Sequence, residues 1–225
     1  MCHRDSYPRA AIHRLFIAAI SLLLLGSSTA WGQGSPWIVD DDGAGDFLTI
    51  QEAIDIASDG DVIIVYPGTY YGTGDASTPV VNLKGKELQI VNNGDGIRPV
   101  VDGEGIHRCI ETDSGENSNT LIEGFVFQNG ASDFGGGLFC RSSSPIFKQC
   151  AFNNNWASNN GGGIFVQFGS PIFENCTVEN NEADYGGGMY LRKLKQPTGP
   201  LTPRRFRNGK FLMTVFADSQ WGADL

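Results

Sequence analysis

Histidine, cysteine and basic residues are scarce in this 225-residue chain. It has 3 histidines, and only His107 lies outside the first thirty residues. Catalysis or zinc binding by histidine therefore has almost nothing to use. Between Ile38 and Leu191 there are 22 acidic and 6 basic residues, a net charge of −16. Such an acidic body repels nucleic acid, so we expect no nucleic-acid partner.

Long apolar runs are also missing. The longest, from Leu15 to Gly26, has about 12 residues, follows three arginines and precedes Ser28-Thr29-Ala30. It is too short to span a bilayer and is typical of a secretory signal peptide, which we predict over residues 1–30. An uncleaved anchor is the alternative. We expect a secreted or cell-envelope protein with no transmembrane segment after cleavage.

A run of three glycines recurs, starting at Gly135, Gly161 and Gly186. Ser144-Pro145-Ile146-Phe147 likewise returns as Ser170-Pro171-Ile172-Phe173. A fixed period of 25 to 26 residues is the signature of stacked repeats. The glycines precede strand-like segments rather than a helix, so they indicate sharp bends between closely stacked backbones and not a phosphate loop.

The segment before the repeats predicts a short helix and then a strand. Thr49 and Glu52 have the spacing of a capping box, Asp59-Gly60 ends the helix, and Val62 to Tyr66 is strand-like. This helix is suited to cover the first edge of a stack of strands.

Two segments carry a family resemblance. Asp41 to Ile54, followed by Val62 to Tyr70, resembles the first coil of the pectin-lyase-like superfamily of right-handed parallel β-helices. The later repeats are similar to those of bacterial polymorphic outer-membrane proteins. The resemblance implies an all-β, single-stranded, right-handed parallel β-helix with a short N-terminal capping helix. We expect this domain to cover residues 38–191, with about five coils counted from Asp61.

The resemblance implies fold rather than activity, because the superfamily holds lyases, hydrolases, esterases and non-enzymes. The pectinesterase likeness ends after the first coil. The Gln-Asp-Thr, Asp-Phe-Ile-Phe-Gly and Gly-Arg-Pro-Trp segments expected of that enzyme are missing.

Residues 192–225 abandon the repeat and carry 7 basic and 2 acidic residues. We interpret them as a non-repeat basic tail that is disordered, or as a chain end altered relative to a longer parent.

Side chains that recur at the coil period predict ladders. Cys150 and Cys176 share one repeat position, where stacked side chains point in parallel, so we predict reduced thiols rather than a disulfide. Cys109 and Cys140 have no assigned state. Asn129, Asn155 and Asn181 stand 26 residues apart and are interpreted as a register-fixing ladder of amides.

Strand alternation places Phe139, Phe165 and Tyr190 outward, one above another. We predict that they form a ligand-binding platform for sugar rings or for a protein partner; the alternative is that another part of the chain covers them.

Acidic side chains beside the glycine runs give the metal and catalytic candidates. Asp133, Asn159 and Asp184 could hold Ca²⁺, the one cofactor considered, although a solvated turn is the competing interpretation. Asp133, Arg141 and Asp184 are the candidates for a polysaccharide lyase or glycoside hydrolase. Because no complete catalytic group assembles, we predict a non-catalytic surface module that binds polysaccharide or a surface protein. A calcium-dependent, pectate-lyase-like enzyme and an N-terminal fragment of a larger surface protein are the alternatives.

Overall fold

The computed structural model describes residues 35–192 and the strand 211–215. The predicted signal peptide and all of the tail beyond Arg192 except this strand lie outside the described residues, so both remain predictions.

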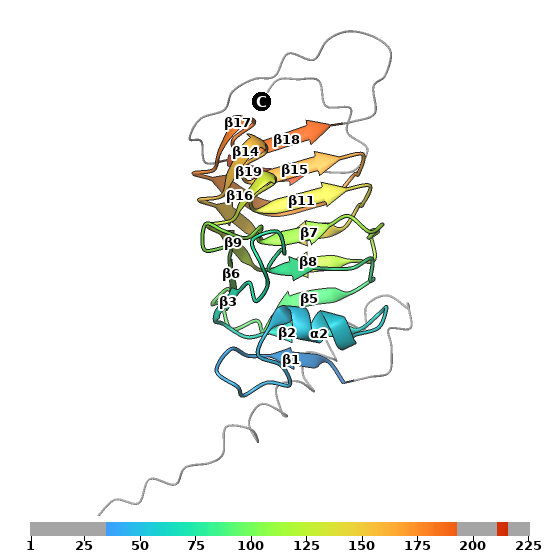
Figure 1. Ribbon diagram of the computed structural model, residues 1–225. Helices are drawn as coiled ribbons and strands as arrows, with labels where there is room; N and C mark the ends of the chain where they lie inside the picture. The colour runs from blue at the N-terminus through green and yellow to red at the C-terminus, as the bar shows by residue number, and fades with distance from the viewer. Residues whose placement is uncertain (1–34, 193–210, 216–225) are drawn as a thin grey trace, which may run out of the picture. The chain divides into compact units, whose positions relative to one another are not determined.

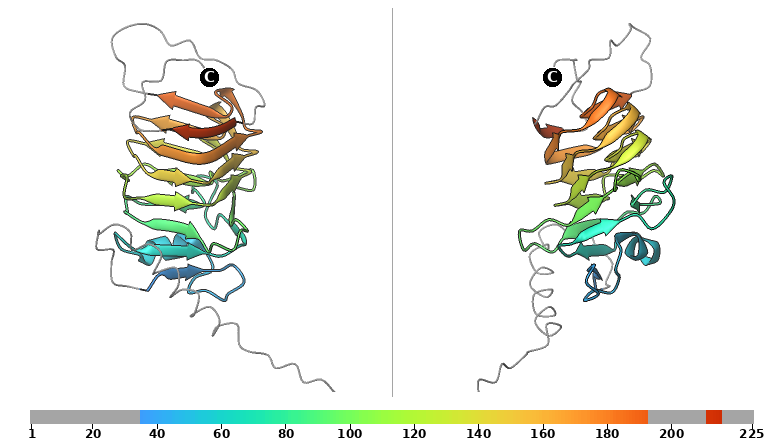
Figure 2. Two further views of the ribbon diagram at one scale, coloured as in Figure 1. Left: turned by 180° about the vertical axis from the view of Figure 1, so that it is seen from behind. Right: turned by 60° about the vertical axis from the view of Figure 1, so that its left-hand side comes forward.

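The chain winds into a parallel β-solenoid in which each coil adds one strand to each of three faces (Figures 1 and 2). The first face consists of β1 (Trp37–Val39), β2 (Val62–Val65), β5 (Gln89–Asn92), β8 (Leu121–Glu123), β12 (Ile146–Lys148) and the start of β16 (Ile172–Glu179). The second consists of β3 (Thr69–Tyr71), β6 (Val100–Asp102), β9 (Val126–Gln128), β13 (Ala151–Asn153) and the end of β16. The third consists of β4 (Val81–Asn82), β7 (Ile110–Thr112), β11 (Leu138–Arg141), β15 (Ile164–Gln167) and β18 (Met189–Arg192).

A short sheet lies between the second and third faces in the later coils. It consists of β10 (Ala131–Phe134), β14 (Trp156–Asn160) and β17 (Glu182–Tyr185). The six strands of the first face make about six turns, against the five predicted from Asp61, because β1 adds a partial first turn. The predicted parallel β-helix is confirmed. The strand β19 (Phe211–Val215) differs from the coils because it pairs antiparallel with β16.

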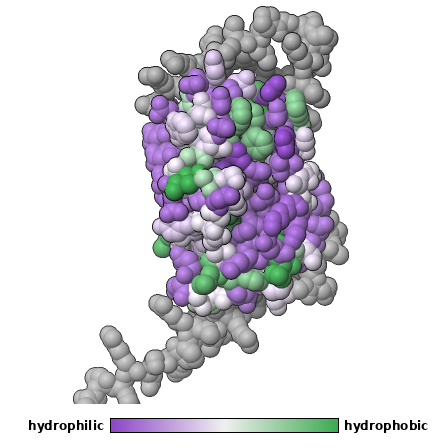
Figure 3. Space-filling view, viewed as in Figure 1, coloured by the Kyte–Doolittle hydropathy of each residue, from purple (hydrophilic) through white to green (hydrophobic). Residues whose placement is uncertain are grey.

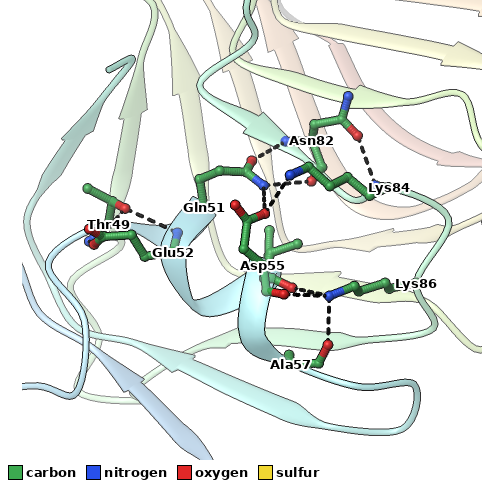
Figure 4. A network of polar contacts seen from close by, with 9 residues as sticks. Thr49, Gln51, Glu52, Asp55, Ala57, Asn82, Lys84 and Lys86 are labelled. Atoms are coloured by element: carbon green, nitrogen blue, oxygen red, sulfur yellow. Dashed lines mark hydrogen bonds and ion pairs between the residues drawn. The ribbon is translucent and has the colours of Figure 1, made fainter. Parts of the chain in front are cut away.

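The one helix of the described residues, α2 (Ile50–Ile56), lies at the N-terminal end of the solenoid, as predicted (Figure 1). Its capping box is present: the Thr49 hydroxyl accepts from the backbone N–H of Glu52, whose carboxylate accepts from Thr49 N–H. Lys86 Nζ donates to the carbonyls of Ile54, Asp55 and Ala57 at 2.6–3.0 Å and so binds the last turn of the helix (Figure 4).

Inward aromatic rings fill the later coils. Phe127 stacks on Phe152 with ring centroids 5.0 Å apart, and Phe147 stacks on Phe173 at 5.4 Å. All four are essentially fully buried, and the burial of each side chain stabilises the fold by about 1.5–3 kcal/mol. All four described cysteines are free and buried, which confirms the reduced thiols predicted for Cys150 and Cys176.

The glycine runs form the corner between the short sheet and the third face. Gly135, Gly161 and Gly186 have φ angles of +62°, +65° and +59°. A Cβ on Gly136 or Gly162 would lie 2.3 Å from a carbonyl oxygen of the next coil. The predicted bends between closely stacked backbones are confirmed.

The asparagine ladder has two rungs rather than the predicted three. Asn155 and Asn181 stack in register and are buried, with Asn155 Nδ2 3.0 Å from Asn181 Oδ1. Asn129 is one position out of step, because Ala131 pairs with Trp156 and the place below Asn155 is therefore taken by Gly130. Asn129 instead occupies a left-handed turn position with φ +53°, which asparagine tolerates better than most residues.

Candidate binding face

The outward row of the third face holds the predicted aromatic ladder. Phe139 pairs with Phe165, and Phe165 pairs with Tyr190, in parallel register. Leu138, Cys140, Ile164 and Val166 alternate with them and are buried in the core. The predicted alternation of inward and outward residues is confirmed.

These rings are not oriented as a sugar-binding platform requires, with their faces toward solvent. Centroids of Phe139 and Phe165 lie 5.5 Å apart with the planes at 11°, and those of Phe165 and Tyr190 lie 5.8 Å apart at 7°. The rings therefore cover one another's faces and turn their edges outward. Phe165 is only 3% exposed, with Phe134 tilted against it. The expectation of an exposed platform is wrong at Phe165, because stacking at the coil spacing uses up the faces that a sugar would need.

Arg108 extends this stack from the coil below. Its guanidinium carbon lies 4.6 Å from the Phe139 centroid, and its nitrogens donate to the carbonyls of Gly135 and Phe134. It also forms an ion pair with Glu111. Burial lowers the pKa of Arg108, and the Glu111 carboxylate opposes that effect. Sequence reasoning missed this residue because it lies outside the recurring pattern.

The three catalytic candidates have separate partners. Arg141 ends β11, is half-exposed, and forms an ion pair with Asp113 at 2.9 Å. Asp133, on the short sheet, accepts a hydrogen bond from the Ser158 hydroxyl at 2.7 Å. Asp184 lies exposed on β17. Arg108 and Arg141 are thus already paired with other acids, Glu111 and Asp113.

The calcium candidates lie along the short sheet, where the strand register shifts. Ser158 and Asn159 together occupy the place opposite Asp133 in the strand below and Asp184 in the strand above, which is a β-bulge. Within residues 35–192, no group of three or more histidine, cysteine or acidic side chains is arranged to hold a metal ion. Calcium binding through Asp133, Asn159 and Asp184 stays a prediction.

The short sheet carries exposed aromatic residues that the sequence did not single out. Trp156 and Tyr185 are each 48% exposed and lie on adjacent strands, β14 and β17. Asp133, Asn159, Glu182 and Asp184 are exposed on the same sheet. We call the exposed surface of this sheet the short-sheet face; Asp184 and Tyr185 are consecutive on β17 and therefore point to opposite sides of that strand. Its exposed rings, unlike those of the third face, are not part of a ring stack.

The surface otherwise shows no large apolar patch on the side drawn in Figure 3, where hydrophilic residues predominate and apolar groups are small and separate. Among the described residues, no helix is both long and apolar enough to span a membrane.

Comparison with known proteins supports the fold. The family described as "Right handed beta helix region" matches residues 81–198, more than half of the chain. A solved structure of pectin methylesterase from carrot is 16% identical, with a TM-score of 0.42. The match covers 71% of this chain and 56% of that one, and at this similarity it carries no argument about fold or activity. No protein of curated description matches the sequence.

Proposed function

The chain belongs to the right-handed β-helix family, and we propose that it is an exported, non-catalytic repeat module whose short-sheet face binds polysaccharide. The observation that carries this proposal is the exposure of Trp156 and Tyr185 on neighbouring strands of a rigid sheet. Aromatic faces of this kind stack on sugar rings, and exposed carboxylates and amides beside them bind hydroxyl groups.

The negative charge of the short-sheet face indicates which class of polysaccharide it can bind. Asp133, Glu182 and Asp184 are exposed there and are not ion-paired with Arg108, Arg141 or Lys148. A polymer of acidic sugars would be repelled, whereas a neutral polysaccharide would not. We therefore expect a neutral polysaccharide as the ligand. The predicted signal peptide would export the protein to the cell envelope or the medium, where it can meet such polymers.

The proposal is tested by cosedimentation of the protein with insoluble neutral and acidic polysaccharides, with and without Ca²⁺. Changing both Trp156 and Tyr185 to Ala should weaken binding to the neutral polymer about 10- to 100-fold, the loss of two ring contacts. Phe168→Ala is the matched control, since Phe168 is 44% exposed but lies beyond β15, outside the short sheet.

Two results would overturn this proposal. Calcium-dependent release of unsaturated products would establish the lyase alternative and direct attention to Asp133, Arg141 and Asp184. No binding to any polymer would leave a protein partner, or a role within a larger surface protein, as the function.

A further inference from the structure

The glycine corner donates hydrogen bonds from each coil to the next one along the chain. Gly135 N–H donates to Asn160 O, and Gly161 N–H donates to Tyr185 O, at 3.1 and 2.9 Å. The third glycine does the same, at 3.1 Å from Gly137 to Gly162 O and 2.9 Å from Gly163 to Gly187 O. The following residues, Leu138 and Ile164, add a third bond at 2.8 and 3.0 Å.

The last coil repeats these donors without a described acceptor. Its equivalent groups are the N–H groups of Gly186, Gly188 and Met189, and no oxygen of residues 35–192 or 211–215 accepts from them. Within residues 35–192 and 211–215, strands β17 and β18 therefore form the last edge of the solenoid and pair on one side. Such an edge is a template for another strand, and unpaired backbone donors shielded from water are costly.

The opposite end of the solenoid shows how this chain covers an edge. There, Ile38 O accepts from Asp46 N–H at 2.7 Å and from Phe47 N–H at 3.1 Å, and α2 lies close by. At the C-terminal end only β16 is covered, by β19, which places Phe211 opposite Val178 and Val215 opposite Phe173. Because β19 is antiparallel, it occupies the next position on the first two faces without continuing the winding.

The chain continues from the last strand of this edge. Strand β18 ends at Arg192 on the third face, and β19 begins at Phe211, beside Val178 where the second face ends. The 18 residues 193–210 join these two points, and they include six basic residues and no acidic one. Glu182 and Asp184 are exposed on the last coil. Because exposed Arg192 ends β18, the edge is acidic at β17, and there it is opposite in charge to this segment.

We propose that residues 193–210 of this chain dock on the β17–β18 edge, their carbonyls accepting from Gly186, Gly188 and Met189 and their basic side chains pairing with Glu182 and Asp184. Attachment at both ends gives the segment an effective concentration of roughly millimolar, which a free partner rarely matches. A second copy would present the same acidic edge and be repelled.

Carbodiimide coupling tests the ion pairs in the full chain, because it joins a lysine amine to a carboxylate only where the two are in contact. The described pairs Lys84–Asp55 and Lys148–Glu123, at 2.7 and 2.9 Å, are internal positive controls. We expect Lys193, Lys195 or Lys210 joined to Glu182 or Asp184. An equal mixture of ¹⁴N- and ¹⁵N-labelled protein separates the sources. We expect cross-links in which both residues carry the same isotope. Cross-links that join a ¹⁴N residue to a ¹⁵N residue, or cross-links at the control pairs alone, would refute docking within one chain.

Amide hydrogen exchange tests the backbone bonds. The amides of Gly186, Gly188 and Met189 should be protected in the full chain, and should exchange about tenfold faster when Arg204, Arg205 and Arg207 are all changed to Glu. Glu104→Gln, an exposed acid at the far side of the molecule, is the control and should leave them unchanged. Free exchange in the full chain, or equal protection in the charge-reversed variant, would overturn the proposal.

Discussion

Replacing Asn155 by alanine tests whether the buried amide ladder holds the coils in register. Asn155 Oδ1 accepts from Gly130 N–H at 2.8 Å, and Asn155 Nδ2 donates to Phe127 O at 3.1 Å. Asn155→Ala leaves both backbone groups buried and without these partners, while Asn181 Oδ1 keeps the bond from Asn155 N–H at 2.9 Å. Each orphaned group costs about 1–3 kcal/mol, so the free energy of unfolding should fall by about 4 kcal/mol.

The assay is a urea titration followed by circular dichroism, with the slope unchanged and the midpoint lowered. Asn159→Ala is the matched control: Asn159 is exposed and contacts only the Ser158 hydroxyl at 3.2 Å, so we expect a change within about 0.5 kcal/mol. A loss below about 1 kcal/mol for Asn155→Ala would refute the reasoning, because it would mean that water or a backbone shift replaces the lost bonds.

Two further predictions concern the arginines and the thiols. Arg108→Ala should lower the free energy of unfolding by about 3 kcal/mol in the same titration, since it leaves the largely buried Glu111 carboxylate unpaired. Arg141→Ala breaks a pair whose arginine is half-exposed, and should lower it by less than about 1 kcal/mol. Equal effects would contradict the difference in burial between the two pairs. Burial raises the pKa of the Cys140 thiol to about 12 from its ordinary 9.0. Its contribution to stability is therefore complete below about pH 9 and is lost as the pH rises toward about 12, so Cys140→Val should flatten the decline of the unfolding free energy measured between pH 8 and 11.

The repeats made the fold predictable from the sequence. Each recurring feature occupies one place in a coil, so the sequence alone predicted a bend at Gly161 and a reduced, stacked thiol at Cys176. The period alternates between 25 and 26 residues, however, and that single-residue uncertainty placed Asn129 in the wrong ladder.

The candidate site was less predictable for physical reasons. Alternation along a strand decides that Phe165 points outward, but whether its face or its edge meets solvent depends on the rings stacked at the coil spacing. Arg108 hydrogen-bonds to residues of the next coil, 24 to 27 positions away, and it does not recur, so no pattern could reveal it. The place of Tyr185 opposite Asn160 follows from a register shift after Ala157, which alternation along the strand does not predict.

The unequal length of the coils indicates where this architecture tolerates change. Leu121 pairs with Ile146 and Ile146 with Ile172, whereas the step from Gln89 to its partner Leu121 is longer, and most of the surplus lies between β5 and β6. The strands on either side keep their register. Insertions at this corner between the first and second faces, and even the loss or duplication of a whole coil, would therefore leave the neighbouring pairings intact. Such a molecule can change its length over evolutionary time without having to invent a new core.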